Sequence, residues 1–371
     1  MPNSPTKTSW IRRLSVFFNL ILFVLLVLTY LNAFLSPKIF WVIGFLSLAF
    51  PYLYLLNFLA LIYWVIRWKY WAYLSGIALL IGIPFVLRTF SFGFSIGDGK
   101  ENYNYLKVMS YNVRIFDLYE WDKKGDNEHN IMRLIKKENP DIICFQEYYN
   151  TSGRSQPDYH TTLELTKSLG YPYHYFQITT KLRKTDEWGI AIFSKYPIVD
   201  SGQINLGKTH NSASYADVCI KNKRYRVFNM HLQSIKLAER EYAFLDNVKM
   251  ENQKDLSATT NILRKIKRAF LRRSSQADKV SAAIAASPYE VIVCGDMNDT
   301  PASYTYTAIG NNLTDVFLQS GFGFGKSYTG LVPTLRIDYM FVSPKIKSCS
   351  TYLVKQPFSD HYPLVSVLDL N

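Results

Sequence analysis

A stretch in the C-terminal half of the chain, YEVIVCGDMNDTP at residues 289–301, joins an apolar run to residues that can do polar chemistry. Residues 290–294 are mostly apolar or β-branched, which predicts a buried strand, and Gly295 allows a sharp turn at its end. Asp296 and Asn298 follow, two residues apart. A carboxylate fixed there can hold a metal ion or a water molecule, and an amide can donate to a phosphate oxygen. Alone, the pattern is weak evidence, because Asp and Asn after a strand are more often turn formers.

Polar side chains recur at the other predicted strands in the same way. Some lie at the end of an apolar run or directly after it. One lies within such a run, and two lie just before the last run of the chain. These residues are Asn112, Glu147, His231, Asp338, Asp360 and His361. A single carboxylate in such a place means little, but six strand-associated positions with these residue types are hard to explain as solvation.

The oxygen-bearing members of this set favour a particular class of metal ion. Glu147 and Asp360 are hard carboxylate ligands, which suit Mg²⁺ or Mn²⁺, whereas zinc would be expected to have more His or Cys around it. The four cysteines have no CxxC spacing, and Cys144 and Cys294 lie inside apolar runs where they are expected to pack as small buried side chains.

Seven segments in order along the chain resemble the endonuclease/exonuclease/phosphatase superfamily, which includes DNase I-like nucleases, abasic-site endonucleases, inositol polyphosphate 5-phosphatases and neutral sphingomyelinases. The segments are SYNVR, DIICFQE, GIAIFSKYPI, NMHLQS, VIVCGDMNDTP, RIDYMFVS and SDHYPL, within residues 105–371. Each motif is weak alone, and the seven in order are strong. The resemblance implies a four-layer α/β sandwich with a Mg²⁺-dependent site at one rim.

The resemblance also implies a metal site on this chain. Glu147 resembles the main metal ligand, with Asn112 and Asp360 nearby. Mg²⁺ is the implied cofactor, with Mn²⁺ as the alternative ion.

Five further residues take catalytic roles by the same resemblance. Asp296 resembles the residue that aligns or deprotonates the attacking water, and Asn298 the one that steadies this water or a phosphate oxygen. His361 resembles the histidine facing the scissile phosphate, with Asp338 as its carboxylate partner. His231 resembles a second phosphate-facing histidine. Phosphodiester hydrolysis needs an in-line nucleophile and neutralisation of charge on the non-bridging oxygens, which these residue types can provide.

The elements that must position these residues indicate an α/β fold. Apolar runs of strand length alternate with a helical pattern at 130–138, and runs at 215–220 and 224–230 flank Lys221-Asn222-Lys223 as a predicted hairpin. Many strands with both hairpins and helical crossovers predict two β-sheets flanked by helices. We therefore divide the chain into a membrane domain at 1–91, a linker at 92–104 and a catalytic domain at 105–371.

The N-terminal domain has the composition of a membrane segment. Apolar runs at 14–35, 39–66 and 70–87 are each near or above the length that a spanning helix needs. Residues 1–91 hold seven Lys or Arg and no Asp or Glu, while the rest of the chain has 35 basic and 29 acidic residues. The formal net charge of +13 is thus partly a membrane-segment signature and is no evidence for nucleic-acid binding.

Basic residues also indicate the orientation of the three predicted transmembrane helices. Lys7, Arg12 and Arg13 precede the first predicted helix. Arg67 and Lys69 join the second helix to the third, whereas only Lys38 lies in the loop between the first and the second. The positive-inside rule then places the N-terminus inside and everything after Thr89 outside the cytoplasm. We expect an integral protein of a bacterial inner or plasma membrane.

Two other segments need interpretation. SGFGFGKSYTG at 320–330 fails the phosphate-loop pattern because Ser320 stands where that motif needs Gly, so we interpret it as a loop at the site rim. Residues 236–273 carry ten basic and five acidic residues. Three interpretations of these charges are open. They form a solvated helix face, they contact anionic lipid headgroups, or they contact a polyanionic substrate.

The sequence thus predicts a membrane-anchored, Mg²⁺-dependent phosphoesterase. The expected partners are the lipid bilayer and a phosphate-ester substrate, with a lipid or headgroup phosphodiester or phosphomonoester favoured. A nuclease acting on DNA or RNA outside the cytoplasm is the first alternative, and a catalytically idle membrane scaffold is the second. Protein partners are not indicated.

The orientation can be tested directly. A reporter enzyme that folds only outside the cytoplasm, fused after Asn371, should be active, because three spans separate it from a cytoplasmic N-terminus. A second fusion to a reporter that works only in the cytoplasm serves as the control. Activity of the cytoplasmic reporter alone would show that the orientation is wrong.

Overall fold

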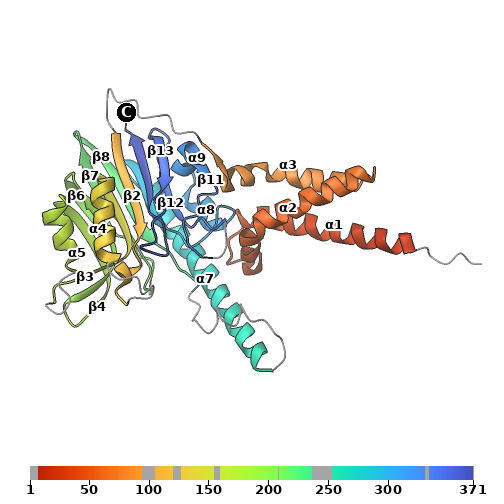
Figure 1. Ribbon diagram of the computed structural model, residues 1–371, viewed down its shortest axis with the longest axis horizontal. Coiled ribbons are helices and arrows are strands. Elements are labelled where there is room, and N and C mark those ends of the chain that lie inside the picture. The colour runs from red at the N-terminus through yellow and green to blue at the C-terminus, as the bar shows by residue number, and fades with distance from the viewer. Residues whose placement is uncertain are drawn as a thin grey trace, which may run out of the picture. The chain divides into compact units, whose positions relative to one another are not determined.

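The computed structural model describes residues 7–93, 105–119, 127–153, 159–207, 209–235, 253–330 and 334–370 (Figure 1). Its contacts group the chain into two units. A helical unit comprises residues 1–89 and 300–307, and a sandwich unit comprises residues 90–299 and 308–371. Of the predicted linker, residues 94–104 lie outside the described residues. Ser91–Phe92 forms a short strand, β1, that pairs with β11, Phe322–Gly323.

The sandwich unit contains two six-stranded mixed sheets, as predicted. The first has the order β10-β12-β9-β8-β7-β6, with β6 Ile198–Gln203, β7 Ser212–Ile220, β8 Lys223–His231, β9 Glu290–Asp296, β10 Thr314–Asp315 and β12 Asp338–Val342. The second has the order β13-β14-β2-β3-β5-β4, with β2 Tyr105–Asn112, β3 Ile142–Thr151, β4 Tyr173–Leu182, β5 Asp186–Ser194, β13 Lys347–Leu353 and β14 Leu364–Asp369.

Helical segments of several lengths accompany the sheets. They are η2 Arg114–Asp117, α4 Asn127–Glu138, α5 Thr161–Leu163, η4 Glu164–Ser168, α7 Gln253–Ala285 and α9 Val316–Ser320. Helix α8, Tyr304–Ile309, begins in residues grouped with the helical unit and ends in residues grouped with the sandwich unit. The long helix α7 is the crossover from β8 to β9, two parallel neighbours in the first sheet. This architecture confirms the predicted α/β sandwich of two sheets with flanking helices.

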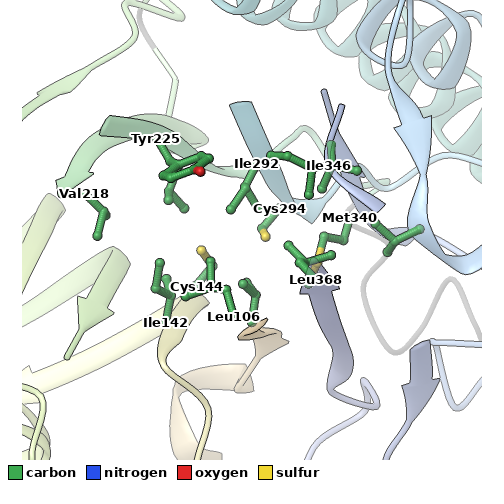
Figure 2. Packing of buried hydrophobic residues seen from close by; sticks show 14 of the residues in the cluster. Leu106, Ile142, Cys144, Val218, Tyr225, Ile292, Cys294, Met340, Ile346 and Leu368 are labelled. Carbon is green, nitrogen blue, oxygen red and sulfur yellow. The ribbon is translucent and has the colours of Figure 1, made fainter. Parts of the chain in front are cut away.

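Alternation along the strands explains why both faces of a sheet are buried. In β3, Ile142 and Cys144 face the other sheet, while Ile143 and Phe145 join the cluster that includes α4. Figure 2 shows Cys144 and Cys294 approaching from opposite sheets within the core. Both side chains are fully buried and both cysteines are free, which agrees with their expected role as small apolar residues.

The hairpin predicted around residues 221–223 is present between β7 and β8. Lys221 and Asn222 have φ values of 46° and 65°, and Ile220 pairs with Lys223. Two consecutive residues with positive φ form the turn whose twist matches the flanking strands. The loop therefore fixes the register of β8, and with it the position of His231 at the end of that strand.

The helical unit consists of three apolar helices, α1 Lys7–Asn32, α2 Gly44–Ile66 and α3 Ala72–Thr89, with a short turn η1 Trp41–Ile43. Each is long and apolar enough to cross a membrane. Polar side chains join them. Asn19 Nδ2 donates to the Trp71 carbonyl at 3.1 Å and Ser75 donates to Asn19 at 2.8 Å. In hydrocarbon such bonds satisfy groups that would otherwise be unpaired.

Several predicted strand limits are wrong. The apolar run DIICF at 141–145 predicts a strand that ends at Phe145, but β3 continues to Thr151, since an extra residue in β3 preserves the pairing with β5. The run at 335–342 predicts a strand from Leu335, but β12 begins at Asp338. Of the basic residues at 236–273, for which a solvated helix face is one of three interpretations, Arg273 departs from that interpretation, because it is only 2% exposed.

Candidate active site

The topology gathers the predicted site residues at one edge of the sandwich. The parallel strands β8 and β9 both end there, at His231 and Asp296, which are paired in register. In the second sheet, β2 and β3 are also parallel, and Asn112 pairs with Gln146 where they approach the same edge. The antiparallel strand β12 starts at Asp338, opposite Asp296.

Asp296 is the centre of this edge, with 1% of its surface exposed. Its Oδ2 accepts hydrogen bonds from Asn112 Nδ2 and Asn298 Nδ2, each at 3.1 Å. Its Oδ1 accepts from the backbone N–H of Asn298 at 2.8 Å. Asn298 has a φ of 53°, a conformation that Asn tolerates better than most residues and that turns its amide back toward Asp296. Gly295 has a φ of 151°, and a Cβ there would collide with the carbonyl of Met230.

Two histidines approach the same carboxylate from different strands. His231 Nε2 lies 3.6 Å from Asp296 Oδ2, and His361 Nε2 lies 3.8 Å from it. The other ring nitrogen of His361, Nδ1, bonds to Asp338 Oδ2 at 2.8 Å. His361 therefore stands between two carboxylates that face each other across neighbouring strands.

Glu147 reaches this edge because β3 is irregular there. Phe145 pairs with Ala191 and Tyr148 with Gly189, so β3 has one residue more than β5 over this interval. Glu147 has a φ of 50° within this bulge, which re-aims its side chain. Its side chain is 38% exposed, and its carboxylate lies 3.7 Å from His231 Nε2.

Asn112 and Asp360 are joined by Ser359 and Arg114. Ser359 Oγ donates to the Asn112 carbonyl at 2.8 Å and to Asp360 Oδ1 at 3.3 Å. The backbone N–H of Arg114 donates to Asn112 Oδ1, and its Nε lies 3.7 Å from Asp360 Oδ2. Arg114, which the sequence analysis did not single out, begins four successive residues with φ between 46° and 56°. The structure thus brings together all eight predicted site residues, while the roles assigned to them stay predictions.

The electrostatics of the edge follow from burial and crowding of charge. Burial first, and then the charge of Asp338, raise the pKa of Asp296 from 3.8 to about 6, although the two histidines act in the opposite direction. Burial alone would lower the pKa of His361, but Asp338 and Asp296 outweigh it and raise this pKa from 6.5 to about 10. At neutral pH the imidazole is therefore expected to be a cation between two carboxylates.

The donor set fits a divalent cation. Carboxylate and amide oxygens are the ligands that Mg²⁺ and Mn²⁺ prefer. Burial and the neighbouring Asp338 disfavour the ionised form of Asp296, so a cation at this edge would favour that form. Glu147 offers the most accessible carboxylate, and the ligand atoms of Asp296, Asp338 and His361 all lie within 4.8 Å of one another. In that trio, however, His361 Nδ1 and Asp338 already bond to each other.

A buried amide pair behind the site was missed by the sequence analysis. Gln146 Nε2 donates to Asn229 Oδ1 at 2.7 Å, and Asn229 Nδ2 donates to the carbonyls of Phe145 and Ala191. The pair thus joins the two sheets directly behind Glu147. The sequence gives only a weak signal for this pair. Gln146 directly precedes the predicted site residue Glu147, and Asn229 lies two residues before His231.

A second missed feature holds the two loops that leave β8 and β9. Arg273 Nε donates to Asp299 Oδ2 at 3.0 Å, and its NH1 donates to the Gln233 carbonyl at 2.8 Å. This places a buried ion pair next to the segment that carries Asn298. Its arginine lies in a basic run, so its burial could not be read from composition.

The predicted rim loop packs against His361. Tyr328 forms a β-bridge with His361, and the two ring centroids are 5.1 Å apart. Ser327 Oγ accepts from the backbone N–H groups of Ile337 and Asp338, each at 3.1 Å. The loop thereby positions both members of the His361–Asp338 pair.

Two parts of the sequence match models of protein families. Residues 109–361 match the model of the Endonuclease/Exonuclease/phosphatase family, and residues 12–89 match a separate domain of unknown function. No curated protein matches the sequence.

Several solved structures are similar to this chain at low sequence identity. TDP2 from D. rerio, complexed with single-strand DNA product, is 17% identical with a TM-score of 0.50 over 72% of this chain and 100% of that chain. The human Nocturnin catalytic domain with bound sulfate is 20% identical with a TM-score of 0.49, over 71% and 93%. An endonuclease/exonuclease/phosphatase family protein from Bacteroides thetaiotaomicron is 17% identical with a TM-score of 0.49, over 72% and 98%. Because the family match spans well over half of the chain, the protein belongs to the endonuclease/exonuclease/phosphatase family.

Proposed function

We propose that this chain is a membrane-anchored phosphoesterase that depends on Mg²⁺ or Mn²⁺ and hydrolyses a lipid or headgroup phosphoester. The observation that carries the proposal is the surroundings of Asp296. A carboxylate with 1% exposure has two amides and two imidazoles within 3.8 Å of a single oxygen. A purely structural role would need one or two partners, whereas this arrangement suits a base that must be oriented and have its pKa set.

Asp296 is proposed to take a proton from the attacking water. The water oxygen forms a bond to phosphorus, the bond from phosphorus to the leaving oxygen breaks, and the proton passes to the carboxylate. A base is most effective when its pKa lies near the working pH, and burial brings the pKa of Asp296 to about 6. Asn298 Nδ2 donates to Asp296 and to the Leu232 carbonyl, so its Oδ1 is the atom that would accept from this water.

His361 and His231 are proposed to stabilise charge on the phosphate. Asp338 fixes the orientation of the His361 ring and holds it as an imidazolium, whose Nε2–H points away from Asp338 toward the site. A cation bound by Glu147, with Asn112 and Asp360, would supply neutralisation of the phosphate charge.

The three apolar helices support a bilayer-associated substrate, because they would confine the enzyme to a surface where lipid phosphoesters are concentrated. The catalytic unit would lie outside the cytoplasm of a bacterial inner membrane. A nuclease remains the alternative, and an idle scaffold is disfavoured because all eight residues and their mutual contacts are present.

The base role can be tested on the full-length protein in lipid nanodiscs, with phospholipids, sphingomyelin, inositol phosphates, DNA and RNA as substrates. Hydrolysis should disappear with a chelator and return with Mg²⁺ or Mn²⁺. Asp296→Asn keeps the shape but removes the charge, so it should lower kcat by at least about 10²-fold. His361→Ala should cost about 10²–10³-fold. Because both residues serve one transition state, the double variant should cost less than the product.

Asp200→Asn is the matched control, since this exposed aspartate lies on β6 away from the edge. It should keep normal turnover. Near-normal turnover of folded Asp296→Asn would refute the role of Asp296, and cleavage of DNA or RNA alone would establish the alternative substrate class.

The charge on His361 gives a test that needs no substrate. In protein freed of divalent ions, ¹⁵N signals of the His361 ring should report a cation at pH 8 and titrate near pH 10. His174, whose pKa burial lowers, should titrate below its ordinary value in the same spectra. Asp338→Asn removes one of the two carboxylates that raise the pKa, so it should shift the His361 titration toward lower pH.

The same shift makes stability depend on pH in a known direction. The pKa of His361 is higher in the folded protein than in the unfolded chain, so its contribution to stability is complete below about pH 6.5 and lost as pH rises through about 10. A neutral His361 at pH 7 in the metal-free protein would contradict the proposed arrangement.

A further inference from the structure

A cluster of phenylalanines is exposed on the sandwich unit and includes none of the eight predicted site residues. Phe90 contacts Phe92, Phe322 and Phe324, with ring centroids 4.8, 5.7 and 4.9 Å apart. Phe92 and Phe322 face each other across the β1–β11 pair. Their exposed fractions are 58% and 69%, and that of Phe324 is 40%. We call Phe92, Phe322 and Phe324 the phenylalanine patch. Contiguous exposed aromatic rings of this kind mark an interaction surface.

The place of the patch along the chain indicates what covers it. Strand β1 begins at Ser91, two residues after α3 ends at Thr89, and α3 is one of the three helices able to span a membrane. A chain extends at most about 3.6 Å per residue, so the Cα of Phe92 lies within about 11 Å of that of Thr89 however the two units are oriented. If α3 crosses the bilayer, the patch is therefore near the bilayer surface, where aromatic side chains are favoured.

Strand β1 is held to the sandwich unit and does not act as a loose tether. Ser91 Oγ donates to the carbonyls of Gly321 at 2.8 Å and Leu318 at 3.3 Å. The backbone N–H of Gly93 donates back to Ser91 Oγ at 3.0 Å, and a Cβ on Gly93 would collide with Gly321. The short connection from α3 thus leads directly into a fixed part of the catalytic fold.

Behind the patch lies a cavity of about 840 Å³ with Phe322 and Phe324 among its lining residues. Ser320 and Thr351, which are 4% and 5% exposed, also line it, and the two hydroxyls hydrogen-bond at 2.9 Å. Among the described residues that line the cavity, the charged ones are two lysines, Lys326 and Lys355. Apolar rings next to hydroxyls and positive charge suit a molecule with an acyl chain and a negatively charged headgroup.

The cavity is joined to the active site through one short segment. Lys326 lines the cavity, and Ser327 and Tyr328 follow it directly. Tyr328 forms the β-bridge with His361, and Ser327 holds the backbone at Asp338. The backbone N–H of Thr329 also donates to the Asp360 carbonyl at 2.8 Å. A ligand in the cavity would therefore contact the segment that supports the His361–Asp338 pair.

We propose that the phenylalanine patch inserts into the bilayer surface and that the cavity behind it takes an anionic phospholipid, with Lys326 and Lys355 facing its headgroup. The proposal names the bilayer as the partner of this surface and deepens the proposed function. The choice of a phospholipid as substrate rests on the proposed function. The contact between the patch and lipid can be tested without any turnover.

Photocrosslinking of the full-length protein tests the contact directly. Benzoylphenylalanine is placed at Phe322 and, as a matched control, at Ile178, an apolar residue of β4 that is 43% exposed. In nanodiscs of phosphatidylglycerol and phosphatidylcholine, irradiation should give phospholipid adducts at position 322 and none at 178. Equal yields at both positions, or adducts to protein alone at 322, would overturn the proposal.

The preference for negative charge has its own control pair. Lys355→Gln should reduce the share of phosphatidylglycerol among the adducts at position 322. Lys347→Gln, at the first residue of β13, should leave it unchanged, because Lys347 is not among the described residues that line the cavity. If the share of phosphatidylglycerol is unchanged in Lys355→Gln, Lys355 does not contact the lipid headgroup, and this part of the proposal is wrong.

Kinetics separate this proposal from the proposed function. Because Phe322→Ser removes apolar surface that would be buried in the bilayer, it should lower kcat/KM on a bilayer phospholipid about tenfold or more. Hydrolysis of water-soluble bis(p-nitrophenyl) phosphate should be unchanged. If the protein without substitutions hydrolyses neither substrate, while the benzoylphenylalanine variant at position 322 still gives lipid adducts, the proposed function alone is refuted. Normal lipid hydrolysis by Phe322→Ser, without adducts at position 322, would refute the lipid contact alone.

Discussion

Two aspartates face each other across neighbouring strands, and the rest of the site depends on how their repulsion is relieved. Asp296 and Asp338 are directly paired between β9 and β12, and both are almost fully buried. Like charges opposite each other in a sheet are destabilising. His361 lies between them, bonded to Asp338 and 3.8 Å from Asp296, so it offsets part of the repulsion and keeps its own charge. The negative charge that remains suits a divalent cation, and such a cation would in turn offset the charge of a phosphate.

The fold reaches this arrangement partly through irregular backbone at the site itself. Glu147 occupies a β-bulge with positive φ, and Asn298, two residues after Asp296, also has positive φ. Such conformations persist when the surrounding structure determines them. Here the Gln146–Asn229 bonds join the sheets behind Glu147, and the Arg273–Asp299 pair holds the turn that follows Asn298.

Much of this could be predicted, because strand ends are visible in a sequence and topology brings parallel ends to one edge. The polar residues after the apolar runs 225–230 and 290–294 pointed to the site for that reason. The bulge at Glu147 could not be predicted, since no local pattern announces positive φ at a glutamate. The burial of Arg273 and the Gln146–Asn229 pair depend on partners more than 20 residues away, which only the assembled sheets and helix bring together. The phenylalanine patch likewise combines residues 90–92 with residues 322–324.

The most direct test of the central claim is to locate a cation in crystals of the protein grown with Mn²⁺, using anomalous scattering. The account predicts a peak at the edge where β8 and β9 end, bound by the Glu147 carboxylate and close to Asp296. The peak should disappear in Glu147→Ala while the two sheets keep their structure. Manganese bound elsewhere, with none at this edge in protein that Mn²⁺ activates, would contradict the account.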